Sequence, residues 1–252
     1  MSPSDPRFPP AYAPRAVVTD EDVVRLAIEG ARSGDLGAGD LLWSLRTTHA
    51  QAAIVLEPEV PFSEAVQAVP LLMVSIADAL GAIGPPNLAV TLRWPQTVLV
   101  NGADVGRVGL WVPPETGADD IPPRLVVDFS VAVDREEALN DPGLNPGTTV
   151  LFEEGCGDLD RSQILGAVAR HFLARLDEWQ EEGFALARRS FLACADGLGR
   201  DVEVPLHGRS LQGRMAGLDP SGGFQLDTND ARMVIHLSDV FRRSMQPLAP
   251  VS

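Results

Sequence analysis

Lysine is missing from this chain of 252 residues, and all 20 residues of the combined lysine and arginine count are arginines. The absence excludes a lysine that contacts nucleotide phosphates in a P-loop, and a lysine that forms a Schiff base with a carbonyl substrate. Any permanent positive charge that the protein places on a substrate must therefore come from arginine.

Cysteine is also scarce, because only Cys156 and Cys194 occur and they are far apart in the sequence. Neither belongs to a CxxC pair or to a zinc-binding spacing, so we expect no disulfide framework and no metal site. No apolar run approaches 18 residues, and the first ten residues lack the apolar segment of a signal peptide. These absences predict a cytoplasmic protein that is neither secreted nor membrane-spanning.

Acidic residues outnumber basic residues by 35 to 20, which gives a formal net charge of −15. Binding to nucleic acid requires a basic face, and so does binding to an anionic membrane surface. We therefore expect neither as a partner, and the acidic surface is explained by solubility. With 45% hydrophobic and 22% charged residues, the chain has the composition of an ordinary globular protein.

A hairpin signal stands near the middle of the chain. The runs 98–100 and 105–112 are mostly β-branched or aliphatic, and Asn101-Gly102 lies between them. Asn-Gly favours a type I′ turn, which needs positive φ at both central residues, so the pattern predicts two antiparallel strands. Pro95 cannot donate to a sheet hydrogen bond and marks the end of an earlier strand. Arg93, Trp94, Gln96 and Thr97 are thereby gathered at one strand end.

This stretch resembles a known family. The run from Arg93 to Gly102, RWPQTVLVNG, is similar to the Lys-Trp-Pro-Asn-Asp segment and hairpin of the biotin/lipoate protein ligase superfamily. The segments 176–184 and 197–202 resemble the helical end of a biotin ligase catalytic domain, and 213–240 resembles the SH3-like barrel that follows it. These three motifs occur in the correct order, and the resemblance as a whole covers roughly residues 20–240.

The resemblance implies an α+β fold: a class II synthetase-like or biotin ligase-like mixed sheet flanked by helices, then a small SH3-like β-barrel. We expect an extended arm at 1–18, a ligase-like domain at 19–199, the small β domain at 200–244 and a tail at 245–252. The periodicity predicts helices over 23–32, 63–81, 160–182 and 184–195, with Pro70 kinking or splitting the second. It predicts strands over 40–47, 52–57, 88–92 and 125–133, and short strands over 202–204, 211–215, 223–226 and 233–237.

In the family, the Trp-Pro segment lines the pocket for the acid and its adenylate. The corresponding substrate-binding candidates here are Arg93, Trp94, Pro95, Gln96, Thr97, Asn101 and Arg107. The catalytic residues stay undetermined, because the family's lysine falls on Asp104, which reverses its charge. Gln96-Thr97 replaces Asn-Asp and loses a carboxylate.

Two further family features differ in this chain. The Gly/Arg-rich loop that closes over the adenylate is replaced by the segment 45–51, LRTTHAQ, which contains no glycine and one arginine. Arg46 and His49 of that segment are additional site candidates, although an exposed turn histidine is the simpler interpretation. A glycine-containing run on the later strand becomes VDFSVA at 127–132, where the large Phe129 is expected to fill part of the pocket.

Three functions remain open. The first is a divergent ligase-like protein that binds a small carboxylic acid, or a biotinyl or lipoyl acceptor domain, with weak or absent adenylation; here Arg93→Ala is expected to abolish acid binding. The second is a working ligase or acyltransferase that uses ATP, Mg²⁺ and biotin or lipoate, with Arg46, Arg93 and Arg107 replacing the lysine. The third is an interaction module whose pocket is filled by Trp94, Trp111 and Phe129.

Overall fold

The computed structural model describes residues 5–18, 22–135, 147–206 and 209–243. Its larger sheet has seven strands in the order β1-β2-β3-β7-β6-β5-β4. β1 and β2 are parallel and the other pairs are antiparallel, so the sheet is mixed, as predicted. The strands are β1 (Ala13–Val17), β2 (Asp40–Ser44), β3 (His49–Leu56), β4 (Val90–Arg93), β5 (Thr97–Val100), β6 (Ala103–Trp111) and β7 (Leu125–Ala132).

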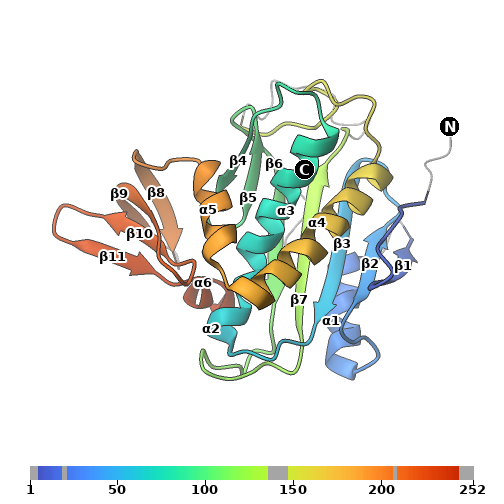
Figure 1. Ribbon diagram of the computed structural model, residues 1–252, viewed down its shortest axis with the longest axis horizontal. Coiled ribbons are helices and arrows are strands. Elements are labelled where there is room, and N and C mark those ends of the chain that lie inside the picture. The colour runs from blue at the N-terminus through green and yellow to red at the C-terminus, as the bar shows by residue number, and fades with distance from the viewer. Residues whose placement is uncertain (1–4, 19–21, 136–146, 207–208, 244–252) are drawn as a thin grey trace.

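Helices cover the two faces of this sheet unequally (Figure 1). One face packs against α3 (Ala68–Ile83), α4 (Arg161–Glu182) and α5 (Ala185–Ala193), preceded by the short α2 (Phe62–Ala65). The other face carries α1 (Val23–Ser33), which packs on β1, β2, β3 and β7. We call these the helical face and the α1 face. The larger core lies on the helical face.

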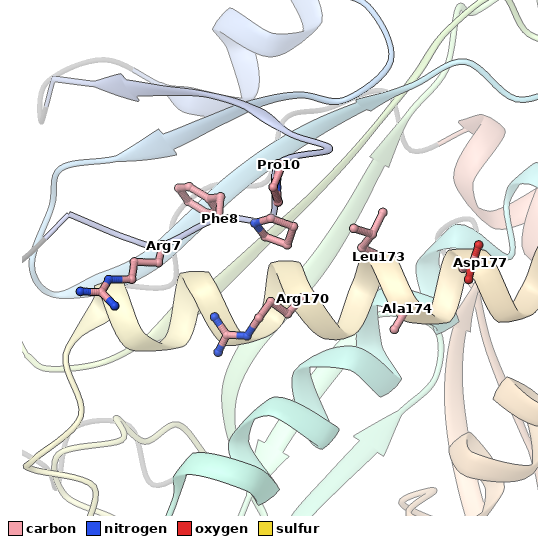
Figure 2. Close-up of a pocket in the computed structure, with 8 residues that line it drawn as sticks. Arg7, Phe8, Pro10, Arg170, Leu173, Ala174 and Asp177 are labelled. Atoms are coloured by element: carbon pink, nitrogen blue, oxygen red, sulfur yellow. The ribbon is translucent and has the colours of Figure 1, made fainter.

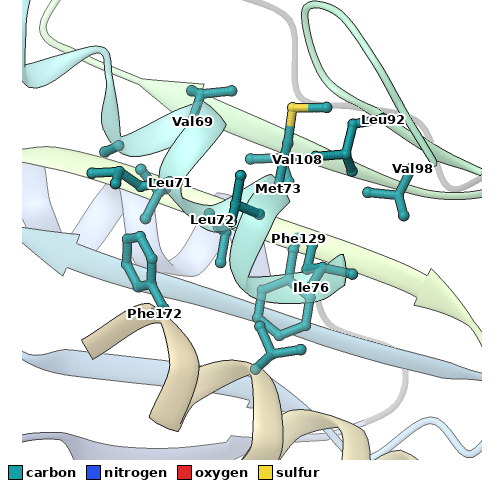
Figure 3. Packing of buried hydrophobic residues seen from close by; sticks show 14 of the residues in the cluster. Val69, Leu71, Leu72, Met73, Ile76, Leu92, Val98, Val108, Phe129 and Phe172 are labelled. Atoms are coloured by element: carbon teal, nitrogen blue, oxygen red, sulfur yellow. The ribbon is translucent and has the colours of Figure 1, made fainter. Parts of the chain in front are cut away.

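Figure 3 shows this core, in which α3 and α4 pack on side chains of alternate strand positions. Because successive residues of a strand point to opposite faces, the residues of β7 face the helical face and the α1 face in alternation. Phe129 is 1% exposed and packs against the helices, whereas Val126 packs under α1. Phe129 therefore does not project from the α1 face. The expectation that it fills part of a ligand pocket is wrong for any pocket on that face. The apolar stretch Phe62–Ile83 is long enough to span a membrane, but 72% of its apolar window is buried, as in a core helix.

A second, smaller sheet follows the helices, at the left of Figure 1. It contains β8 (Asp201–Leu206), β9 (Arg209–Leu218), β10 (Phe224–Asp227) and β11 (Arg232–Ile235) in the antiparallel order β11-β10-β9-β8. This sheet fits the predicted SH3-like domain. The helix α6 (Leu237–Arg243) that comes after it was not predicted, because its seven residues are too few for a clear 3.6-residue periodicity.

Several element boundaries differ from the sequence prediction. β2 ends at Ser44 and β3 begins at His49, so the connection between the strands predicted at 40–47 and 52–57 is instead 45–48. The predicted helix 63–81 is split into α2 and α3, as Pro70 suggested, but the break precedes that proline. Pro70 lies in the first turn of α3, where its missing N–H has no intrahelical partner to lose. Pro61 takes the N-cap position of α2, one residue before the helix begins at Phe62.

The N-terminal arm is attached to the domain at several points. Residues 13–17 form β1, which pairs in parallel with β2 at the edge of the sheet. The Tyr12 hydroxyl donates to the carbonyl of Ala169 in α4 at 3.2 Å, and the Phe8 ring lies 6.3 Å from the Trp43 ring. The described part of the arm is therefore packed on the domain. Residues 1–4 and the predicted tail at 245–252 lie outside the described ranges.

Two side chains of the large domain join it to the turn between β9 and β10. Gln67, at the break between α2 and α3, donates from Nε2 to the carbonyl of Ser221 at 3.3 Å. The same side chain accepts a hydrogen bond from Trp179 Nε1 of α4 at 2.6 Å. Trp94 Nε1 donates to the carbonyl of Gly222 at 3.3 Å. The two sheets thus share one packed core.

Candidate functional site

The predicted hairpin positions the candidate site. Asn101 has φ 51° and Gly102 has φ 89°, as the type I′ turn requires, and β5 pairs with β6. At the other end of β5, Arg93 pairs with Thr97, so residues 94–96 form the connection between β4 and β5. The Trp94-Pro95 peptide bond in this connection is cis. The segment 93–97 therefore lies at the opposite end of β5 from the hairpin turn, where the sheet faces the small domain.

A cleft of about 470 Å³ lies between this segment and the small domain. It is lined by Arg93, Trp94, Pro95, Gln96, Thr97, Arg107, Asp196, Val202, Glu203, Val204, Phe224 and Val240. Six of the seven predicted substrate-binding residues are thus brought together, all except Asn101. A cavity at this place argues against the third hypothesis, in which aromatic side chains fill the pocket.

Arg93 is engaged by two carboxylates. Its Nη1 lies 2.8 Å from Asp104 Oδ1, and its Nε lies 2.9 Å from Asp196 Oδ2. Asp196 also binds Arg200, whose Nη2 lies 2.7 Å from Asp196 Oδ1. Exposed pairs of this kind contribute little stability, about 0–1 kcal/mol each. Their consequence is electrostatic, because the guanidinium charge that would meet an anionic ligand is already balanced.

Trp94 is a packing residue as well as part of the cleft wall. It is 6% exposed, and its ring lies 5.0 Å from the Phe224 ring at an interplanar angle of 39°. This tilted contact and the hydrogen bond to Gly222 fasten β10 to the large sheet. The sequence pattern placed Trp94 beside a ligand but could not identify Phe224 as its partner.

Five polar residues lie in one line across the α1 face. Arg93 pairs with Thr97, Thr97 with Arg107, Arg107 with Ser130, and Ser130 with Gln51, on five neighbouring strands. Directly paired residues point to the same face, so we call these five the polar row. With strands about 4.8 Å apart, the row extends over roughly 19 Å. None of the five is fully buried.

Arg107 is the central cation of the polar row. It lines the cleft, and none of the described residues forms an ion pair or hydrogen bond with its guanidinium. Arg107 therefore differs from Arg93, whose charge is balanced. An anionic group that enters the cleft would find a free guanidinium donor here.

Asp128 lies next to the polar row, two residues before Ser130 on β7. It is 6% exposed, and burial, with the nearby charge of Asp22 adding, raises the pKa of its carboxyl to about 7. The paired position on β6 is Gly109, where an added Cβ would lie 2.2 Å from Asp128 Oδ2. The alternation along β7 is a signal that could have placed Asp128 and Ser130 on one face, but the large Phe129 between them obscured it.

The other candidates lie outside the cleft. Asn101 caps the hairpin, accepting from the Ala89 N–H at 3.2 Å and donating to Glu154 at 2.6 Å. His49 begins β3, with Nδ1 3.0 Å from the Thr48 hydroxyl. Arg46 lies in the short connection before it. Within the described ranges, no three His, Cys, Asp or Glu side chains come together where they could hold a metal ion.

A second hollow, of about 740 Å³, lies between the N-terminal arm and α4. Figure 2 shows Phe8 and Pro10 of the arm facing Leu173 of α4, with Arg7 and Arg170 toward one end and Asp177 toward the other. It holds none of the predicted site residues. The cleft beside the polar row is therefore the candidate site.

Comparison with known proteins supports the resemblance. A biotin--[acetyl-CoA-carboxylase] ligase of Paracoccus denitrificans is 26% identical over 200 residues, which are 79% of this chain and 82% of that protein. The bifunctional ligase/repressor BirA of Bacillus subtilis is 20% identical over 188 residues, and the match spans 75% of this chain and 56% of that protein.

Solved structures agree in fold. A biotin protein ligase-like protein of unknown function from Silicibacter sp. has a TM-score of 0.83 at 31% identity, with 93% of this chain and 98% of that chain covered. The biotin protein ligase of Aquifex aeolicus in complex with biotin and ATP has a TM-score of 0.71 at 21% identity, with 90% and 97% covered. The model of the biotin/lipoate A/B protein ligase family matches residues 8–193, so the chain belongs to this family.

Proposed function

We propose that this chain is a divergent family member that binds a small carboxylic acid in the cleft, with weak or absent adenylation of that acid. The observation that carries the proposal is the engagement of Arg93 by Asp104 and Asp196. Adenylation concentrates negative charge and needs preorganised positive donors where that charge develops. Here the position of the family's lysine holds Asp104, and this aspartate neutralises the neighbouring arginine.

The charges that line the cleft fit an acid better than a nucleotide. Two arginines, Arg93 and Arg107, and two carboxylates, Asp196 and Glu203, line it, so their formal charges cancel. A triphosphate carries several negative charges and needs a surplus of cations, so this donor set does not fit ATP phosphates. One carboxylate, by contrast, needs one guanidinium, and Arg107 meets that requirement.

The acid is either free or attached to a protein. The Paracoccus denitrificans relative is named for its action on acetyl-CoA carboxylase, and the Aquifex aeolicus protein was solved with biotin and ATP. We therefore extend the proposal to biotin or lipoate as the ligand and to a biotinyl or lipoyl acceptor domain as a protein partner.

The test is to titrate the purified chain with biotin, lipoate and octanoate by calorimetry, and to assay ATP–pyrophosphate exchange with Mg²⁺ and each acid. Binding of an acid without exchange supports the proposal, and no binding of any acid overturns it. Arg107→Gln is expected to weaken binding roughly 10- to 100-fold, because a charge-assisted hydrogen bond is lost. Arg15→Gln, on the distant strand β1, is the matched control and should leave affinity unchanged.

Arg93→Ala tests a different contribution in the same titration. Its removal releases the Asp104 and Asp196 carboxylates, so acid binding is expected to weaken through added negative charge as well as through the lost cation. If Arg93→Ala abolishes binding while Arg107→Gln has no effect, the acid is held by Arg93 and the assignment to Arg107 is wrong.

A working ligase is the second candidate function. The free guanidinium of Arg107 in the cleft and the sequence similarity to a ligase of Paracoccus denitrificans favour it. In that case exchange depends on one of the three acids, and the chain labels an acceptor protein in the presence of ATP. Exchange with one acid would replace the first proposal by this one.

A further inference from the structure

The hollow of about 740 Å³ between the N-terminal arm and α4 has walls that the rest of the fold holds in place. We call it the arm groove. Its arm wall is formed by residues 8–10, in which two prolines restrict the backbone. The Tyr12 hydroxyl fastens this wall to the carbonyl of Ala169, and the Phe8 ring lies beside the Trp43 ring. The arm groove is therefore a preformed feature of the surface.

The opposite wall is a stripe along the outer side of α4. Its members follow the spacing i, i+3, i+4 and i+7, which places them on one side of the helix: Arg170, Leu173, Ala174 and Asp177. A rise of about 1.5 Å per residue puts the first and the last of them about 10.5 Å apart along the helix axis. None of the residues that line the arm groove is fully buried, so its apolar middle faces water.

The two ends of the arm groove carry opposite charges. Arg7 and Arg170 lie toward one end and Asp177 toward the other (Figure 2). Gly166 allows the two arginines to meet, because a Cβ there would lie 2.9 Å from the Arg7 carbonyl oxygen and 3.3 Å from Arg170 Nη1. Within the described ranges, none of these three charged side chains forms an ion pair or a hydrogen bond. Two neighbouring guanidinium groups are thus available to one anionic group.

The net charge of the protein limits what this anionic group can belong to. At −15, the chain as a whole repels an extended anionic surface, whereas two local cations attract a single carboxylate. A site for a free small molecule buries most of its ligand, but a ligand in the arm groove would stay largely in water because every lining residue is exposed or half-exposed. An apolar middle between charged ends is instead the arrangement of a protein interface.

We propose that the arm groove binds a segment of a partner protein in which an apolar side chain lies between an acidic and a basic residue. The carboxylate pairs with Arg7 and Arg170, the apolar side chain packs between Phe8 and Leu173, and the basic residue pairs with Asp177. In an extended chain, about 10.5 Å corresponds to three residues at roughly 3.3 Å each, so the acidic and basic residues are three positions apart. The arm groove lies on the helical face, so the proposal does not depend on an acid in the cleft.

The test titrates the peptide acetyl-Gly-Glu-Leu-Leu-Lys-Gly-amide into the full ¹⁵N-labelled chain and follows the backbone amide signals by NMR. Signals of residues 7–10 and 170–177 should shift, with a dissociation constant on the order of 1 mM because the contacts are few. Replacing the peptide's Glu by Gln should weaken binding about tenfold, and Arg170→Gln should have the same effect, because a charge-assisted hydrogen bond is lost. Arg189→Gln, at an exposed position of α5 outside the arm groove, is the matched control and should leave the affinity unchanged.

Four outcomes would overturn the proposal. The first is the absence of shifts in these signals at peptide concentrations up to about 10 mM. The second is equal binding of the peptide to the native chain and to folded Arg7→Gln and Arg170→Gln variants, with urea denaturation verifying the fold. In the third, octanoate shifts the same signals as strongly as the peptide, which identifies a free apolar acid as the occupant; octanoate in the cleft would instead shift signals of residues 93–97. In the fourth, the arm-groove signals move with protein concentration alone, which identifies a second copy of the chain.

Discussion

Replacement of Asp128 by asparagine should make the protein more stable at high pH and change little at low pH. Burial raises the pKa of this carboxyl from an ordinary value of 3.8 to about 7. The folded state therefore holds a proton that the unfolded chain releases, and the free energy of unfolding falls as the pH rises from about 4 to about 7. Above that range the loss is constant.

The magnitude follows from the two pKa values. One pKa unit is worth about 1.4 kcal/mol, so a fully ionised Asp128 costs the fold about 4 kcal/mol at pH 8. Part of this cost is already present at pH 5, where the unfolded carboxyl is ionised. Between pH 5 and pH 8, the free energy of unfolding should fall by about 2–3 kcal/mol through this group alone.

Urea denaturation at pH 5, 6, 7 and 8 measures the effect, with the native chain, Asp128→Asn and the exposed control Asp119→Asn side by side. Other groups titrate over the same range, so the quantity to compare is the difference between variant and native protein. That difference should widen by about 2–3 kcal/mol in favour of Asp128→Asn from pH 5 to pH 8 and stay near zero for the control. Parallel curves for Asp128→Asn and the native chain would refute the reasoning, because the carboxyl would then be solvated or paired.

Two further predictions concern packing around the site. Gly109→Ala should cost about 1–3 kcal/mol in urea denaturation, because its Cβ would meet Asp128 Oδ2 at 2.2 Å, and most of this cost should vanish in an Asp128→Ala background. An equal cost in both backgrounds would mean that another atom makes the clash. Trp94→Ala should cost about 3–5 kcal/mol, because a buried ring packed on Phe224 is removed. A loss below about 1 kcal/mol would contradict a joining role for Trp94.

Local sequence signals predicted the parts of the fold that depend on local chemistry. Asn101-Gly102 specified the hairpin and its register, and Gly183 ended α4. The strand β1 was missed because five residues that include Pro14 carry little strand signal, and they form a strand only by pairing with β2. Phe129 was expected to fill part of the ligand pocket, but it packs in the core on the helical face, because side chains alternate between the two faces along β7.

The candidate site was predicted in location but not in its electrostatics. The residues around Trp94 were correctly gathered, because one turn holds them together. The partner of Arg93 that comes from the small-domain side, Asp196, is 103 residues away in sequence, and no local pattern signals such a contact. Asp104 was recognised as a charge reversal, but its ion pair with Arg93 needed the register of β4, β5 and β6.

The hydrogen bonds from Gln67 and Trp94 to the turn between β9 and β10 determine how the cleft can behave. A hinge motion that separated its walls would break both bonds and draw the Trp94 ring out of the shared core. We therefore expect the cleft to keep a fixed width. If a ligand binds there, its association rate should be governed by diffusion and orientation, and not by opening of the domains. Molecules too thick for the cleft are excluded, which makes thickness a second criterion of selection beside hydrogen bonding.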